Sequence, residues 1–241
     1  MKASVVVPAF NEERLIGACL RAIGEALAAF GDAGWRHEVV VCDNNSTDRT
    51  AQIAAAAGAR VVFEPVNQIS RARNAGAAAA SGDWLVFVDA DSTPSRALFE
   101  EVERAIASGR VLAGGCTVRL ALERKDVAAA VGAWNALSRV LKWAAGSFIF
   151  CEAAAFREIG GFSERLFAAE EIDFSRRIKR LARARGRTVE ILHRHPLLTS
   201  GRKAELYRTR DLLRFMAKTL LSGGGALRRR EDCAPWYDGR R

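Results

Sequence analysis

Short apolar runs rich in β-branched residues alternate with alanine-rich stretches through the first half of the chain, and this alternation limits the fold more than any other feature. The runs predict strands over residues 4–7, 38–42, 60–63 and 84–88. From a start near Glu12, apolar residues recur at helical spacing, and they are Ile16, Leu20, Ile23, Leu27 and Phe30. Strands that alternate with helices are typical of a mostly parallel sheet flanked by helices, so we predict an α/β fold.

The second half of the chain changes in character but supplies the same kinds of element. We predict strands over residues 112–120, 147–150 and 188–192, and helices over 125–143 and 170–184. Thr93 followed by Pro94 is typical of a helix start and predicts a helix through about Ser108. A basic tail follows, with helical spacing over 211–221. We therefore predict a single domain over residues 1–204 and a basic C-terminal helical extension over 205–241.

The composition is that of an ordinary globular protein, with 49% hydrophobic and 27% charged residues among 241. The five cysteines are scattered without Cys-x-x-Cys spacing, which indicates reduced core residues rather than disulfides or a zinc site. Met1-Lys2 leads straight into a strand-like run, and no stretch approaches the roughly 18 apolar residues of a membrane span. We therefore expect a soluble, cytoplasmic protein.

The formal net charge of +9 favours anionic partners. A nucleoside diphosphate, a nucleic acid and an acidic lipid surface all meet that description. The chain shows no basic motif studded with aromatic residues, so we expect no nucleic acid as partner.

Three polar clusters follow three of the predicted strands, at the point where each strand ends. They are Pro8 to Glu12, Asp43 to Asp48, and Asp89-Ala90-Asp91. Taken singly, Asn11 and Ser46 can cap helices and Asp43 can begin a turn. Ligands of doubly wound sheets bind at the carboxyl ends of the strands, however, and the joint placement of the clusters predicts one binding site there.

The third cluster delivers two carboxylates at a strand end. Alternate residues of a strand share a face, so we expect Asp89 and Asp91 to point the same way. Such a pair can hold one hard divalent cation between itself and a diphosphate, which suits nucleotide-sugar chemistry. Acidic strand ends that are only solvated are the alternative interpretation.

The order of these motifs resembles family 2 glycosyltransferases. The resemblance rests on Val5 to Glu12, Asp43 to Asp48, Ala72-Arg73-Asn74-Ala75-Gly76 and Asp89-Ala90-Asp91, and it continues through Phe156 to Arg165 and Glu170 to Phe174. It covers roughly residues 3 to 200. Several motifs in the right order are stronger evidence for a family than any one of them alone. The resemblance implies a GT-A fold, that of nucleotide-diphospho-sugar transferases.

The resemblance also implies a donor site. In it, Pro8, Ala9, Phe10, Asn11, Glu12 and Asp43 hold the base and ribose of a nucleotide. Asp89, Ala90 and Asp91 bind ribose and a Mn²⁺ or Mg²⁺ ion that bridges the diphosphate. Arg73 lies near the donor, although a solvated helix cation is the equal alternative.

In inverting members of the family, the second residue of a Glu-Asp pair before a late helix is the general base. Here the pair reads Glu170-Glu171, so the resemblance implies Glu171 as the catalytic base, with Glu170 and Asp173 as rivals. Acidic residues in a first helical turn also favour the helix dipole, which is the structural alternative.

A histidine from the last part of the domain often completes the metal site of GT-A enzymes. His193 is the residue we assign, with His195 as the rival, and either can also be an ordinary surface histidine. Arg202 and Lys203 follow, and either a clamp on diphosphate oxygens or a solvated basic loop would account for them.

Together these features predict a metal-dependent, inverting glycosyltransferase. It moves a single sugar from a nucleotide-diphosphate donor to an acceptor hydroxyl, carried by a lipid or a small molecule. One alternative is a sugar-nucleotide-binding module without turnover, because Glu171 stands where aspartate is usual. The other is a sugar nucleotidyltransferase, although such enzymes usually have a Gly-rich loop where this chain has Pro8 to Glu12.

The tail combines an apolar stripe with arginines. The stripe is Leu212, Leu213, Phe215, Met216 and Leu220. Such a helix can lie on an anionic membrane surface, which would place the enzyme peripherally on the inner face of the membrane. Packing of the stripe on the catalytic domain is the alternative.

Overall fold

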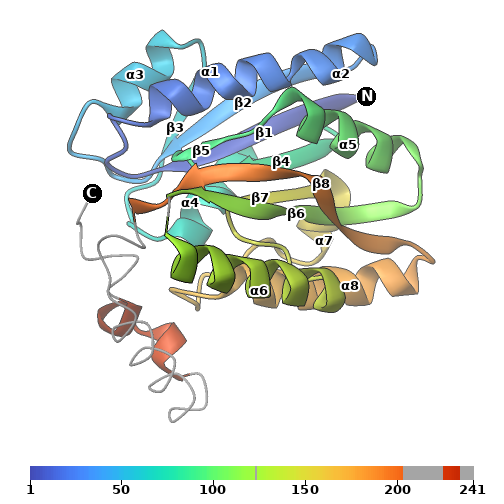
Figure 1. Ribbon diagram of the computed structural model, residues 1–241. Coiled ribbons are helices and arrows are strands. Elements are labelled where there is room, and N and C mark those ends of the chain that lie inside the picture. The colour runs from blue at the N-terminus through green and yellow to red at the C-terminus, as the bar shows by residue number, and fades with distance from the viewer. Residues whose placement is uncertain (123, 203–224, 234–241) are drawn as a thin grey trace.

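One eight-stranded sheet, in the order β3-β2-β1-β4-β7-β6-β8-β5, organises the molecule (Figure 1). The computed structural model describes residues 1–122, 124–202 and 225–233. The strands are β1 (Lys2–Ala9), β2 (Arg36–Asp43), β3 (Arg60–Phe63), β4 (Trp84–Val88), β5 (Ser92–Thr93), β6 (Val111–Ala121), β7 (Phe148–Glu152) and β8 (Thr188–Ser200).

The sheet consists of two parallel parts joined by one antiparallel strand. β1 pairs in parallel with β2 and β4, and β2 with β3. β6 pairs in parallel with β8. β7 lies antiparallel between β4 and β6, and the short β5 pairs antiparallel with the end of β8. The prediction of a mostly parallel sheet is therefore confirmed.

Helices cover both faces of this sheet. They are α1 (Ile16–Ala26), α2 (Ala28–Asp32), α3 (Thr50–Ala56), α4 (Ile69–Ala79), α5 (Arg96–Ala107), α6 (Lys125–Leu141), α7 (Ala153–Glu158) and α8 (Glu170–Ala184). Figure 1 shows α1, α2, α3 and α5 on one face, and α4, α6, α7 and α8 on the other. Two short 3₁₀ turns follow near the C-terminus, η1 (Gly225–Arg228) and η2 (Arg230–Cys233).

Several element boundaries differ from those predicted. α1 begins at Ile16, because Asn11 adopts a left-handed φ of 52° and the backbone turns through Glu12 before the helix starts. Ser95, not Thr93, caps α5, and its side chain accepts a hydrogen bond from the Leu98 N–H. β8 continues to Ser200, eight residues beyond the predicted end at residue 192.

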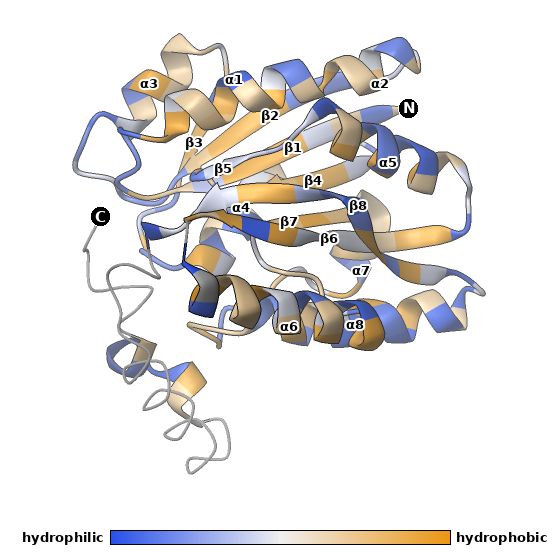
Figure 2. Ribbon diagram, viewed as in Figure 1, coloured by the Kyte–Doolittle hydropathy of each residue, from blue (hydrophilic) through white to orange (hydrophobic). Residues whose placement is uncertain are grey.

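The strands are apolar on both faces because both are covered (Figure 2). Val5, Val7 and Val41 pack under α1 and α5, whereas Val6 and Phe87 face α4, α7 and α8. α4 lies close to β1 at Gly76, where an added Cβ would lie 2.5 Å from the Val6 Cγ1. This close approach lets the second half of α4 lie directly against β1.

The expected core thiols are present. All five cysteines are free and buried, and burial raises the pKa of Cys19 and Cys42 to about 12. Within the described ranges, no helix is both long and apolar enough to cross a bilayer.

The predicted helix over 211–221 lies outside the described residues, so the extension over 205–241 stays a prediction. Of this extension, 225–233 is described. There the Leu227 carbonyl accepts a hydrogen bond of 2.7 Å from the Phe167 N–H, which joins η1 to the loop before α8.

Candidate active site

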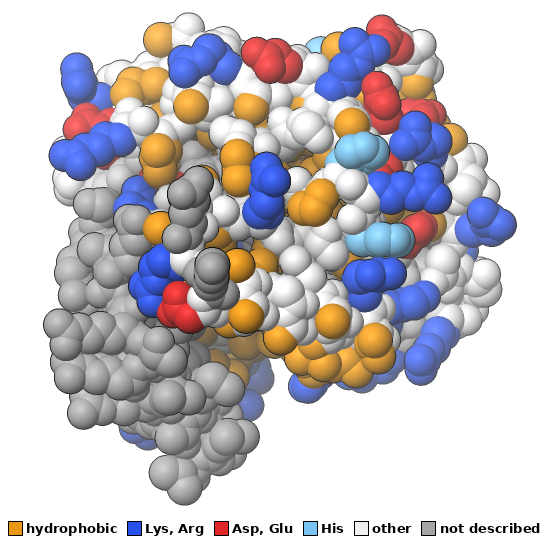
Figure 3. Space-filling view, in the orientation of Figure 1, with side chains coloured by type: hydrophobic (Ala, Val, Ile, Leu, Met, Phe, Trp, Pro, Cys, Tyr) orange, Lys and Arg blue, Asp and Glu red, His pale blue; other side chains and the backbone are white. Residues whose placement is uncertain are grey.

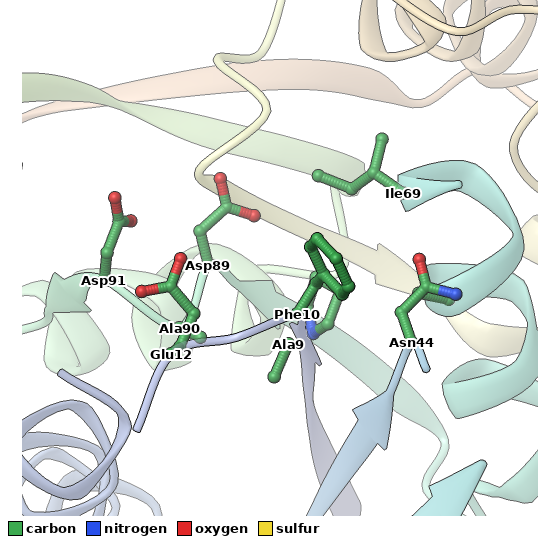
Figure 4. A pocket seen from close by; sticks show the side chains of 10 residues that line it. Ala9, Phe10, Glu12, Asn44, Ile69, Asp89, Ala90 and Asp91 are labelled. Atoms are coloured by element: carbon green, nitrogen blue, oxygen red, sulfur yellow. The ribbon is translucent and has the colours of Figure 1, made fainter. Parts of the chain in front are cut away.

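A cavity opens at the carboxyl ends of β1, β2 and β4 (Figure 4). Seven of the predicted donor-binding residues line it, and these are Pro8, Ala9, Phe10, Glu12, Asp89, Ala90 and Asp91. The carboxylates gather at one end, and Phe10 and Asn44 lie at the other. These seven residues therefore share one hollow in the fold, and binding of a donor there stays a prediction.

Asp89 and Asp91 point to the same side, with the Glu12 carboxylate beside them (Figure 4). The reason differs from the one predicted. β4 ends at Val88, and residues 89–92 form a turn closed by a 3.0 Å hydrogen bond from the Ser92 N–H to the Asp89 carbonyl. Turn geometry, rather than alternation along a strand, therefore brings the two carboxylates together.

Glu12 is held by a residue from the far end of the domain. The Arg202 guanidinium donates to both carboxylate oxygens of Glu12, at 2.7 and 3.1 Å, and its Nη2 lies 3.9 Å from Asp91 Oδ2. Arg202 therefore stands at the carboxylate end of the cavity, and its role as a clamp on diphosphate oxygens stays a prediction. Lys203 lies outside the described residues.

Asn11, in the turn after β1, and Asp43, the last residue of β2, lie beside the cavity rather than in its lining. Asn11 Oδ1 accepts a 2.8 Å hydrogen bond from the Thr47 N–H, and Asp43 Oδ1 accepts one of 3.1 Å from the Ser46 N–H. Ser46 also accepts from the Asn11 N–H. These contacts tie the loop after β1 to the loop after β2. A donor contact for Asn11 or Asp43 stays a prediction.

Three further residues line the cavity, none of them assigned to the donor site from the sequence: Asn44, Ile69 and Ala72. The buried Asn44 side chain joins two segments: its Nδ2 donates to the Val66 carbonyl at 2.6 Å, and its Oδ1 accepts from the Gln68 N–H at 2.8 Å. It thereby fixes the start of α4 beside β2. The paired asparagines after β2 were a usable signal for it.

Arg73 is buried, with 1% of its surface exposed, so the alternative of a solvated cation is wrong. Its Nη1 donates to Glu170 at 2.7 Å, and its Nη2 donates to Asp89 at 3.0 Å and to the Gly146 carbonyl at 2.7 Å. The guanidinium also lies 5.2 Å from the centre of the Phe162 ring. Arg73 therefore contacts Asp89 from the protein interior and links it to Glu170 at the start of α8.

The three candidate bases at the start of α8 have different surroundings. Glu170 is buried against Arg73, and Asp173 pairs with Arg177 at 2.8 Å. Glu171 is half-buried beside Gly146, where an added Cβ would lie 3.6 Å from the Glu171 Cδ. Burial, and then the charge of Glu170, raise the pKa of Glu171 to about 8. The base role of Glu171 stays a prediction.

The metal-ligand prediction for His193 is wrong, because the residue lies too far along β8. Leu192 pairs with Cys116, and Thr199, which hydrogen-bonds Asp91, pairs with Leu120. Cys116 and Leu120 are four residues apart on β6, which is about 13 Å along the strand. The start of the bulge that contains His193 is therefore about that far along the sheet from the position where Thr199 contacts Asp91. The rival His195 contacts Glu101 through its Nδ1 at 2.6 Å. Both histidines lie in a bulge of β8 where its register against β6 shifts.

The remaining donor set still fits a divalent cation. Two carboxylates on one turn suit Mg²⁺ or Mn²⁺, which take oxygen ligands and complete their shell with waters and substrate phosphates. Over the residues that the structure describes, no group of three or more His, Cys, Asp or Glu is placed to hold a metal. Asp89 and Asp91 would therefore hold such an ion together with the substrate.

Comparison with known proteins gives one family match. The family described as Glycosyl transferase family 2 matches residues 4–158. An uncharacterized glycosyltransferase of Mycobacterium tuberculosis is 42% identical over 90 residues, which are 37% of this chain and 37% of that protein. The chain thus spans just over a third of the length of the curated relatives that it matches first.

Solved structures share the fold at low sequence identity. TarS of S. aureus, at 21% identity, superimposes with a TM-score of 0.65 over 84% of this chain and 61% of that chain. Glucosyl-3-phosphoglycerate synthase from Mycobacterium tuberculosis, in complex with Mn²⁺ and uridine-diphosphate-glucose, has 21% identity and a TM-score of 0.61. That likeness covers 91% of this chain and 76% of the synthase.

Proposed function

Because the chain belongs to glycosyltransferase family 2 and has a GT-A fold, we propose that it transfers one sugar from a nucleoside diphosphate to an acceptor hydroxyl. One observation carries the proposal. Asp89 and Asp91 lie at one end of the cavity, and behind it Arg73 pairs with both Asp89 and Glu170, the residue before the half-buried Glu171. The residues proposed for leaving-group stabilisation and for general-base catalysis, the two requirements of inverting transfer, are thus linked through Arg73 and Glu170.

The donor would lie along the cavity, with its nucleoside against Phe10, Asn44 and Ile69 and its diphosphate toward Asp89 and Asp91. The structural neighbours support a nucleotide sugar, since one is a complex with UDP-GlcNAc and another with uridine-diphosphate-glucose and Mn²⁺. A divalent cation held by the two aspartates would neutralise charge on the departing diphosphate. Arg202 would add a second positive charge at the same end.

Glu171 would accept the proton of the acceptor hydroxyl. The acceptor oxygen then bonds to the anomeric carbon while the bond from that carbon to the phosphate oxygen breaks, and the nucleoside diphosphate leaves with inversion at the sugar. Glu170 is less suited to this role because its carboxylate already pairs with Arg73. Asp173 pairs with Arg177, which also donates to the Ile159 carbonyl.

The test is a panel of nucleotide sugars assayed with and without Mn²⁺ for binding by calorimetry and for slow release of nucleoside diphosphate. We expect one donor to bind in a Mn²⁺-dependent manner and to be hydrolysed. Asp91→Asn should lose the Mn²⁺-dependent part of the affinity, whereas Asp126→Asn, on the exposed start of α6, should keep it.

Absence of binding to every nucleotide sugar in the presence of Mn²⁺ would refute the proposal. Donor binding without transfer of the sugar to any acceptor or to water, and so without release of nucleoside diphosphate, would instead favour the binding module without turnover. Family membership favours sugar transfer over nucleotidyl transfer.

A further inference from the structure

α6 is an apolar helix that lies on the surface. Among its described side chains only Ser138 is buried, and Leu137 and Val140 expose 46% and 79% of their surface. We call its exposed stripe the α6 outer face; it consists of Ala129, Ala130, Ala133, Ala136, Leu137 and Val140. A surface helix normally carries charged residues in these positions.

The opposite side of α6 is anchored to the sheet. The Asn135 side chain pairs with both backbone groups of Val118, accepting from its N–H at 3.0 Å and donating to its carbonyl at 2.8 Å. Val131 and Trp134 pack on the core. The α6 outer face is therefore held outward and cannot bury itself by rotation of the helix.

A row of cations on α8 lies next to this helix. We call it the α8 basic stripe; it consists of Arg176, Lys179, Arg180 and Arg183, which share one side of α8. Lys179 Nζ donates to the Leu141 carbonyl at 2.6 Å, and Arg176 lies over the Trp143 ring. The stripe is thereby fixed against the end of α6.

The α8 basic stripe is not neutralised. Among the described residues, none of its four members, nor Arg139 or Lys142 at the end of α6, forms an ion pair with a carboxylate. Burial, and then the charges of Arg183, Lys142 and Arg176, lower the pKa of Lys179. This concentration of like charge attracts anionic partners.

We propose that the α6 outer face and the α8 basic stripe dock the protein on an anionic lipid bilayer. Figure 3 shows hydrophobic side chains gathered along α6, with Lys and Arg at their margin. A bilayer satisfies both features at once, since apolar side chains enter the interface while cations meet anionic headgroups. An acidic protein surface would satisfy the cations but would leave Leu137 and Val140 against polar groups.

Docking in this way would bring the site close to the lipid. α8 begins at Glu170, and Arg176 lies five residues after Glu171, or about 8 Å along the helix axis. An acceptor hydroxyl carried by a lipid headgroup would then lie near the proposed base. This last point rests on the proposed function, whereas the docking itself is independent of catalysis.

The test is cosedimentation of the full chain with vesicles of phosphatidylglycerol and phosphatidylcholine, against pure phosphatidylcholine, at low salt and at 0.5 M salt. We expect binding to the anionic vesicles only, and its loss in high salt. Arg176→Glu/Arg180→Glu should weaken binding at least about tenfold. Leu137→Ser/Val140→Ser should weaken it about threefold or more, and circular dichroism should show both variants folded.

A matched control distinguishes this surface from net charge. Arg21→Glu/Arg36→Glu makes the same change of charge at exposed residues outside α6 and α8, and should reduce binding less than threefold. An equal loss in the control, or unchanged binding in both α6 and α8 variants, would overturn the proposal. So would a change of oligomeric state in the Leu137→Ser/Val140→Ser variant by ultracentrifugation, because a second copy would then be the occupant.

Discussion

Arg202 and Glu12, 190 residues apart in sequence, share two hydrogen bonds of 2.7 and 3.1 Å. The pair joins Arg202, just beyond the end of β8, to Glu12 in the turn after β1. That turn also contains Phe10. Removal of a well-paired charge from a buried site leaves its partner unfavourably placed. This relationship makes Arg202 a structural support of the donor cavity as well as a candidate diphosphate ligand.

Arg202→Gln should therefore lower the free energy of unfolding by about 2–3 kcal/mol and weaken binding of nucleoside diphosphates. Urea denaturation and calorimetry measure the two effects. The double variant Glu12→Gln/Arg202→Gln should recover part of the stability, since the buried charge is then gone. If the double variant is less stable than Arg202→Gln alone, the ion pair is not the reason for the loss.

Glu171→Gln should lower the rate of sugar transfer about 10²-fold or more while it leaves donor affinity unchanged, because only the proton acceptor is removed. Asp173→Asn is the matched control on the same helical turn, and its carboxylate already pairs with Arg177. Steady-state rates and donor affinity measured for both variants check this. A larger loss in Asp173→Asn than in Glu171→Gln would assign the base to Asp173.

The rate of transfer should rise with pH through an apparent pKa near 8, because Glu171 must lose its proton before it can accept one. The raised pKa of Glu171 affects stability in the opposite direction: the rate rises with pH, whereas stability falls. The folded state binds this proton more tightly than the unfolded state, so stability falls as pH rises from about 4.5 to about 8. The difference between the denaturation midpoints at pH 5 and pH 8.5 should be smaller in Glu171→Gln than in the parent protein.

Arg73→Met should lower the free energy of unfolding by about 3–5 kcal/mol, because two carboxylates and the Gly146 carbonyl lose a buried partner. Arg71→Met, two residues earlier on α4, is the control. That arginine pairs with Glu64 and Glu164 at a more exposed position, and its loss should amount to about 1 kcal/mol or less. Comparable losses in the two variants, by urea denaturation, would contradict the buried network.

The sequence predicted best those features that depend on local pattern. β3, β4 and α8 have the predicted bounds, because uniform apolar runs or acidic first turns mark their ends. β8 was predicted too short, since the polar residues His193, Arg194 and His195 interrupt its pattern in a bulge. The histidine ligand was wrong for the same reason, because the residues assigned as following the strand lie within it.

The site was predictable where several motifs converge on one cavity, and less so where a contact depends on distant segments. Asp89 and Asp91 could be placed from their position after β4. Glu170 and Gly146 could not be recognised as partners of Arg73, because their contacts cross 97 and 73 residues of chain and leave no local pattern.

Arg73 also has a consequence for the divergence of such sequences. One guanidinium shared by Asp89 and Glu170 means that a change at any of the three positions leaves a charge stranded in the interior. We therefore expect substitutions at positions 73, 89 and 170 to occur together in the same sequence rather than singly. In an alignment of diverging descendants these positions would covary as one group, and a descendant that replaced Arg73 by an apolar residue should also have lost the acid at 170.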